Sequence, residues 1–300
     1  MTQTRREPAE PAWEGKSKGN KAGYSIFIGI LRIGGIGPAY FLLRFVTFYY
    51  LLFSWSSSRP ILAFYKKLGF GYVKRVRTLY RNYYVFGQTL IDKIVVMSGI
   101  KVPYTFVFDG EHHIEEMMAG GRGGILISAH MGNYELAGYY FKRLPVKVNI
   151  IMVDQEQQQI KDYLESVMND RNLNIIHIKD DFSHIYEISN ALRRNELVAI
   201  HADRFVKGSK TIEGTLLGER ALYPVGPFVL ATIFKVPVSY VFCFKETAKH
   251  YHLYSSPPRE YTTRKEIAIP EALKDYVTAL EAKIKTYPEQ WFNYYDFWEQ

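Results

Sequence analysis

The stretch GGILISAHMGNYELAG, residues 123–138, sets the fold that we expect for the chain. Its short apolar run between glycines predicts a buried strand, and Asn133 followed by Tyr-Glu-Leu-Ala predicts the N-cap and first turn of a helix. His130 then lies in the turn that joins them. Ligands of open α/β sheets bind at such strand ends, so we expect this imidazole to border a crevice.

Glu135 follows His130 by five residues, in the first turn of the predicted helix. The chain can fold back there so that the carboxylate accepts a hydrogen bond from one imidazole nitrogen. That bond would fix the tautomer and leave the other nitrogen as a base near neutral pH. A structural role stays open at this point, with His130 bonded to backbone and Glu135 favoured by the helix dipole.

Strand and helix patterns alternate on both sides of this stretch, which predicts an α/β fold with a mostly parallel central sheet flanked by helices. Besides the apolar run that follows Gly124, the expected strands are 105–108, 146–153, 174–178, 197–201, 236–244 and 250–254. The expected helices are 111–119, 155–171, 182–194 and 228–234, with two more within 61–100.

Two other places carry candidate chemistry. The strand at 197–201 ends in His-Ala-Asp-Arg, at the same sheet edge as His130 if the strands are parallel, and Arg204 could hold an anionic group with its planar guanidinium. A surface ion pair of Asp203 with Arg204 is the alternative. Gly226-Pro227 opens a helix whose free N–H groups could face an oxyanion.

Charge is concentrated near the N-terminus. The first 91 residues hold 14 Lys and Arg against three Glu, with no acidic residue between Glu14 and Asp92. Such a segment suits a polyanion, either nucleic acid or an anionic lipid surface. The aromatic and apolar character of residues 23–58 argues against nucleic acid.

We therefore predict a polar basic N-terminus at 1–22, a membrane-associated helical segment at 23–75 and a catalytic domain at 76–300. Arg32 and Arg44 interrupt the apolar run, so two helices hinged at Gly35–Pro38 and dipping into one leaflet fit better than a full span. The basic flanks would bind anionic head groups. A buried helical hairpin of a soluble protein is the alternative.

A single cysteine, Cys243, excludes a disulfide framework and a cysteine-based zinc cluster, and the eight histidines show no convincing metal-ligand spacing. We expect no metal site.

These blocks together resemble the bacterial lipid A biosynthesis acyltransferases, within the lysophospholipid acyltransferase group. The resemblance spans about 23–298 and rests on four motifs in order. They are His130 with an acid five residues later, His-Ala-Asp-Arg at 201–204, LLGERALYPVGPFVLATIFKVPV at 216–238, and Pro-Glu-Gln-Trp at 288–291.

The resemblance implies transfer of a fatty acyl chain from acyl carrier protein, or acyl-CoA, to a hydroxyl of a membrane lipid. His130 would be the general base and Glu135 would orient it. Because a thioester is already activated, no cofactor is needed. The residues expected to bind substrate or the oxyanion are Asp203, Arg204, Asn133, Arg220 and Gly226.

Two departures bear on the acceptor. Val225 stands where glycerophosphate acyltransferases keep a glutamate, which disfavours phosphatidate synthesis, and Arg204 stands where lipid A enzymes usually keep glutamine. The acceptor is thus expected to be a lipid A precursor or another glycolipid or amino-acid lipid. The resemblance implies the cytoplasmic face of a bacterial inner membrane, held by a monotopic or single-pass anchor. The alternative is a catalytically inactive lipid-binding or scaffolding protein with this fold.

Overall fold

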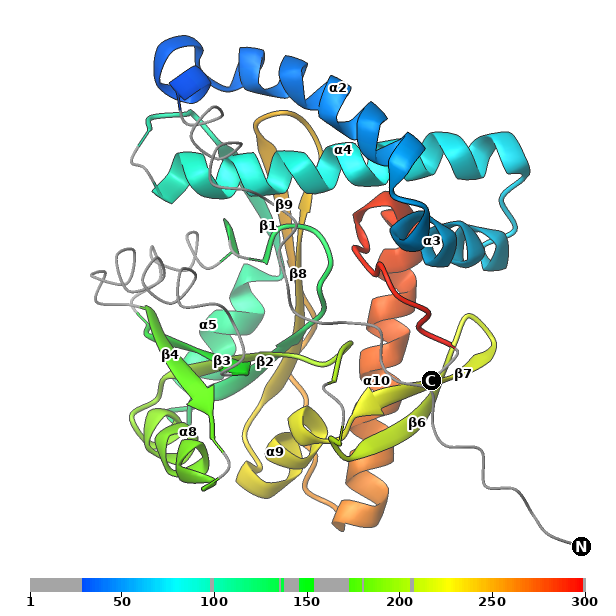
Figure 1. Ribbon diagram of the computed structural model, residues 1–300. Coiled ribbons are helices and arrows are strands. Elements are labelled where there is room, and N and C mark those ends of the chain that lie inside the picture. Colours follow the sequence, from blue (N-terminus) through cyan, green and yellow to red (C-terminus); the bar gives the residue numbers. More distant parts are fainter. Residues whose placement is uncertain are drawn as a thin grey trace, which may run out of the picture.

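The computed structural model describes residues 29–97, 100–134, 136–137, 146–153, 173–179, 181–205 and 208–298. A central sheet lies between layers of helices, and three N-terminal helices cross one end of it (Figure 1). The helices are α2 (Ile36–Phe53), α3 (Trp55–Lys67), α4 (Tyr72–Met97), α5 (Glu111–Ala119), α8 (Ser183–Arg193), α9 (Gly226–Phe234) and α10 (Lys265–Thr286), with a 3-10 turn, η1 (Pro288–Gln290).

The main sheet has seven strands in the order β1-β9-β8-β2-β5-β3-β4. Their bounds are β1 (Thr105–Asp109), β2 (Gly124–Ser128), β3 (Val148–Val153), β4 (Leu173–Ile178), β5 (Leu197–His201), β8 (Val238–Lys245) and β9 (His250–Ser255). Every neighbouring pair is parallel except β8 with β9. The predicted fold class, a mostly parallel sheet flanked by helices, is confirmed.

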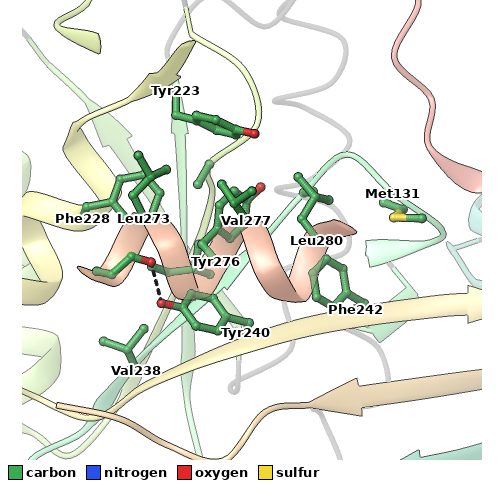
Figure 2. Packing of buried hydrophobic residues seen from close by; sticks show 14 of the residues in the cluster. Met131, Tyr223, Phe228, Val238, Tyr240, Phe242, Leu273, Tyr276, Val277 and Leu280 are labelled. Atoms are coloured by element: carbon green, nitrogen blue, oxygen red, sulfur yellow. Dashed lines mark hydrogen bonds between the residues drawn. The ribbon is translucent and has the colours of Figure 1, made fainter. Parts of the chain in front are cut away.

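The two faces of the sheet are covered by different helices. On one face, α8, α9 and α10 pack against inward residues such as Ile125 and Ile127 of β2. Figure 2 shows part of this packing, in which Tyr276 of α10 lies near Tyr240 of β8, and Leu273 of α10 lies near Phe228 of α9. On the other face, α5 packs against Leu126. Because side chains alternate along a strand, β2 is buried on both sides, as its uninterrupted apolar pattern predicts.

A strand hairpin and the helix α10 were not predicted from the sequence. The hairpin β6 (Thr211–Leu216) and β7 (Glu219–Pro224) turns at Leu217 and Gly218, both at positive φ, and leucine is not a residue that signals such a turn. The bond from the Leu217 N–H to the Glu281 carboxylate, 2.8 Å, helps to hold this turn. In α10 an internal proline, Pro270, interrupts the helical pattern of the sequence. The helix expected at 155–171 lies outside the described residues.

The N-terminal helices form one packed group. A break at Gly35, within the expected hinge, precedes α2, and α2 packs along α4 through Ile36, Ala39 and Leu43. The helix α3 instead buries Phe64 in the main core, with its ring 4.9 Å from that of Trp291. The boundary expected at residue 75 falls inside α4, and the division into domains stays a prediction.

Candidate active site

A tight turn after β2 positions His130. Gly132 has a φ of 65°, and a Cβ there would lie 2.0 Å from the carbonyl oxygen of Cys243 on β8. Only glycine fits this close approach in this conformation. The Asn133 N–H donates to that same carbonyl at 2.7 Å, so the turn is bonded directly to the neighbouring strand.

His130 is paired with a carboxylate from the adjacent parallel strand. Ser128 is in register with His201, so the residues following β2 and β5 leave the sheet together. Asp203 accepts two hydrogen bonds from His130, one from the ring Nδ1 at 2.7 Å and one from the backbone N–H at 2.9 Å. These two bonds fix both the ring and the turn that carries it.

The Asp203 carboxylate is buried, with 1% of the residue exposed. Burial opposes ionisation, but the charges of His130 and Arg204 and the hydrogen bond from His130 hold the pKa of Asp203 below its usual value. The hydroxyl of Tyr295 donates to the Asp203 backbone carbonyl at 3.0 Å. Tyr276 is also buried. Burial, together with the nearby charge of Asp203, raises the pKa of the Tyr276 hydroxyl. Asp203 is therefore an anion with the side chains of Tyr276 and Tyr295 close by.

A second histidine lies against His130. The ring centroids of His130 and His201 are 4.5 Å apart at an interplanar angle of 36°, and the Tyr134 ring meets His201 edge-on at 4.4 Å. Burial, with the charge of His130, lowers the pKa of His201 to about 3. His201 is thus a neutral imidazole at physiological pH.

An apolar pocket of about 70 Å³ opens beside these rings, on the face of the sheet that α5 covers. Ser128, Tyr134 and His201 lie on its wall, next to His130. The remaining lining residues are Phe108, Leu126, Ala137, Val148, Ile150, Ala199, Ile200, Val241, Phe242, Cys243, Leu253 and Tyr254. The arrangement is a mostly apolar space, two of whose lining residues, Tyr134 and His201, contact the ring of His130.

The structure places the predicted site residues in different surroundings. Asp203, expected to bind substrate, bonds to His130. Asn133 is buried, caps the following turn through the Leu136 N–H at 3.2 Å, and donates to the Tyr251 hydroxyl at 3.2 Å. Glu135, the carboxylate predicted from sequence to orient His130, lies outside the described residues.

The other three lie on separate segments. The Arg204 guanidinium donates to the Phe292 carbonyl at 2.6 Å, close to the His130 turn. Arg220 is on the exposed β6–β7 hairpin, ion-paired with Glu213. Gly226 is the first residue of α9, after Val225. Among the described residues, no cluster of three or more His, Cys, Asp or Glu side chains could hold a metal ion.

A C-terminal strap, residues 288–292, clamps the His130 turn from the other side. The Phe292 N–H donates to the His130 carbonyl at 3.2 Å, and the Gly132 N–H donates to the Gln290 carbonyl at 2.8 Å. The Gln290 side chain bonds both backbone groups of Lys245, at 3.0 and 2.8 Å. From α4, the Asn82 amide donates to the Trp291 carbonyl at 3.3 Å. The Pro-Glu-Gln-Trp motif thus joins the turn to β8 and α4.

Replacing Gln290 with methionine, which has a similar volume, should test this clamp. The change leaves the buried N–H and C=O of Lys245 unpaired, at a cost of about 2–4 kcal/mol. We expect the midpoint of chemical denaturation to fall accordingly. A matched change, Gln88→Met at a buried glutamine of α4 outside the strap, should lower it less. Equal midpoints for the two variants would contradict the clamp.

A buried polar network connects the turn to α2. Tyr251, which bonds Asn133, donates to Asp92 of α4, and Asp92 is ion-paired with Lys245 and bonded to Tyr40 of α2. Burial lowers the pKa of Lys245, while the Asp92 charge acts in the opposite direction. The site and the N-terminal helices are therefore connected through charged groups that are fully buried.

His201 opens the His-Ala-Asp-Arg motif, but no role was predicted for it, and the strap contacts of Gln290 were not predicted either. His201 stands in an apolar strand, where only its register opposite Ser128 brings it beside His130. The pairing of His130 with Asp203 could have been predicted, because both strand ends were expected at one edge of the sheet. Nearness in sequence favoured Glu135 instead.

Comparison with known proteins adds the family. The family profile described as "Bacterial lipid A biosynthesis acyltransferase" matches residues 73–299. A phosphatidylinositol mannoside acyltransferase from Mycobacterium tuberculosis is 24% identical over 190 residues, which are 62% of this chain and 57% of that protein. The chain thus spans a little over half the length of this relative. With three quarters of its length matched by one profile, the chain belongs to the bacterial lipid A biosynthesis acyltransferase family.

Proposed function

We propose that this protein is a membrane-bound O-acyltransferase that moves a fatty acyl chain from a thioester to a hydroxyl of a lipid. The observation that carries the proposal is the bond from His130 Nδ1 to the buried Asp203 carboxylate at 2.7 Å. The His130 ring contacts Tyr134 and His201, which line an apolar pocket. Family membership supports the same reaction class.

In the proposed mechanism His130 is the general base. Asp203 holds Nδ1 as a donor, so Nε2 takes the proton from the acceptor hydroxyl as its oxygen attacks the thioester carbon. The C–O bond forms and the carbonyl electrons move to oxygen. Collapse of this tetrahedral intermediate breaks the C–S bond, and the imidazolium returns its proton to the departing thiolate. Asp203 stabilises the imidazolium in between.

The pocket is where we place the start of the acyl chain. Its wall is mostly hydrocarbon, and burial of each methylene contributes about 0.8 kcal/mol. Acyl carrier protein is the proposed donor carrier, with acyl-CoA as the alternative, because an acidic carrier would be steered by the basic helices α3 and α4. No metal or other cofactor is proposed.

The acceptor is proposed to be a lipid A precursor or another glycolipid or amino-acid lipid. Arg204 lies next to the His130 turn and has a guanidinium suited to an anionic head group. Arg220 and the α9 N-terminus at Gly226 stay candidates for substrate contact, although Arg220 is ion-paired with Glu213.

We propose that α2 lies in the plane of an anionic membrane, on the cytoplasmic face of a bacterial inner membrane. Among the described residues, α2 is the one helix with the length and apolar composition to cross a bilayer. One of its faces is packed on α4, a helix rich in charge, which favours an in-plane position. The opposite face exposes Phe41, Phe45, Phe48 and Leu52, the α2 stripe.

The double change Phe45→Asp and Phe48→Asp tests this position. Each phenylalanine is more than half exposed, and insertion of each into the interface is worth about 2 kcal/mol. Binding to phosphatidylglycerol vesicles, measured by sedimentation, should weaken about 100-fold or more. Tyr186→Asp, at an exposed aromatic residue of α8, is the matched control and should bind as the wild type does. Unchanged binding of the double variant would contradict an α2 anchor.

Lipid analysis tests the function itself. Mass spectrometry of a deletion strain should reveal one lipid that lacks a single acyl chain, and the wild-type gene should restore it. The scaffold alternative expects the same restoration from His130→Ala, whereas the acyltransferase proposal expects none. A deletion strain with an unchanged lipid profile would count against the enzyme.

A further inference from the structure

The second histidine of the site, His201, has a geometry that a packing role does not explain. It ends β5 in register with Ser128, and its ring is 4.5 Å from the His130 ring, centroid to centroid. It also lines the apolar pocket, where the Tyr134 ring meets it edge-on at 4.4 Å. An apolar side chain would fill this place without a polar atom to satisfy.

The ring carries a buried polar atom that has nothing to bond. Among the residues that the structure describes, Nδ1 of His201 is buried and has no hydrogen-bond partner. Leaving a buried donor or acceptor unpaired costs about 1–3 kcal/mol. Such a cost in a native site calls for a partner that arrives with the substrate.

The protonation state limits what His201 can do. Burial and the charge of His130 lower its pKa to about 3, while the charge of Asp203 acts in the opposite direction. At pH 7 the ring is neutral, so it has one N–H donor and one acceptor. A group with so low a pKa is a poor base, whereas a neutral imidazole N–H can still donate to a developing negative charge.

We propose that His201 is a second catalytic residue, which donates a hydrogen bond to the carbonyl oxygen of the acyl thioester as that oxygen becomes negative. The inference rests on the proposed function and extends it. When the acceptor oxygen, deprotonated by His130, bonds to the thioester carbon, the carbonyl electron pair moves to the oxygen that His201 faces. The hydrogen bond shortens as the charge grows and relaxes when the C–S bond breaks. His201 itself neither gains nor loses a proton.

Two substitutions separate this role from packing. His201→Asn keeps an amide donor close to the position of Nδ1, and His201→Leu keeps the volume but removes every donor. The assay follows the label from radioactive palmitoyl-acyl carrier protein into a lipid extract of the native membrane. It yields kcat and the KM for the thioester. Melting temperatures show whether each variant folds.

Loss of one oxyanion donor lowers kcat by about 10²–10³-fold. We expect His201→Leu to show this loss with KM changed less than threefold, and His201→Asn to stay within tenfold of the wild type. The acid limb of the pH–rate profile should be the same in His201→Asn and the wild type, because His201 is neutral throughout. If His201→Leu does not fold, His201→Ala with added imidazole replaces it, and activity should rise with imidazole concentration.

Several results would overturn the proposal. A His201→Leu enzyme within threefold of the wild type in kcat means that the ring only packs. Equal losses in His201→Leu and His201→Asn mean that ring shape, and not a donor, is needed. In the substitute experiment, a His201→Ala enzyme that imidazole does not activate has the same meaning. A wild-type protein that transfers no label from palmitoyl-acyl carrier protein or from palmitoyl-CoA would instead overturn the proposed function.

Discussion

Replacement of His130 by asparagine is expected to reduce acyl transfer by at least about 10³-fold while the protein stays folded. Asparagine keeps an amide donor for the Asp203 carboxylate, which His130 Nδ1 bonds at 2.7 Å, but it cannot take a proton from an alcohol. General-base catalysis contributes about 10²–10⁴-fold, and the same group also returns the proton to the thiolate.

The measurement is the rate of label transfer from the thioester to lipid, alongside a melting curve. His112→Asn, at an exposed histidine of α5, is the matched control and should be as active as the wild type. His130→Ala should be equally inactive but less stable, because it removes the ring donor to the buried Asp203 carboxylate and leaves only the backbone N–H. Activity within tenfold of the wild type in His130→Asn would show that the base is another group.

The second large effect is expected at Asp203. In Asp203→Asn, one of the two positions that accept hydrogen bonds becomes an NH₂ group. In the wild type, the backbone N–H and the Nδ1–H of His130 donate to Asp203 at 2.9 and 2.7 Å. In the variant, one of these two donors would face the NH₂ group, which is also a donor. Reversal of the imidazole tautomer relieves the conflict but places a hydrogen on Nε2, where the base must accept one.

We expect kcat of Asp203→Asn to fall by about 10³–10⁴-fold, as for the loss of the carboxylate of a hydrolase triad, with little change in the KM for the thioester. Asp181→Asn, at an exposed aspartate before α8, should leave kcat unchanged. Glu135→Gln is the competing variant, because the sequence points to that residue. If Glu135→Gln loses activity and Asp203→Asn keeps it, the carboxylate that orients His130 comes from the helix after the turn.

Much of the fold follows from local pattern. The alternation of apolar runs and helical spacings from 105 to 255 places the strands within about two residues of their observed bounds. What it misses depends on tertiary contacts. The β6–β7 turn needs a leucine at positive φ, and it is bonded to Glu281 on a helix 64 residues away. No local pattern carries that information.

The site shows the same division. The sequence places His130 in a turn and Asp203 at the same sheet edge, because parallel strands end together. It does not say which carboxylate faces the ring, since that depends on the path of the chain after each strand. The role of the Pro-Glu-Gln-Trp motif could not be predicted either, because Gln290 bonds the backbone groups of Lys245 and Gly132. Every residue has such backbone groups, so the contact does not show in the sequence.

The N-terminal helices show the same limit of sequence-based prediction. The apolar run of α2 can be read from the sequence. The sequence does not predict which face of that helix packs on α4 and which face stays exposed. The buried Asp92–Lys245 pair joins α4 to β8, the strand beside the His130 turn. A membrane position for α2 would therefore place the pocket mouth and the bilayer in a fixed relation, which a lipid acceptor requires.

The most direct measurement is transfer of a radioactive palmitoyl group from acyl carrier protein or CoA to a lipid extract of the native membrane, by the wild type and by His130→Asn. The account predicts a labelled lipid from the wild type, with the label in a base-labile ester, and at least about 10³-fold less from the variant. Equal labelling by the two proteins would contradict the account.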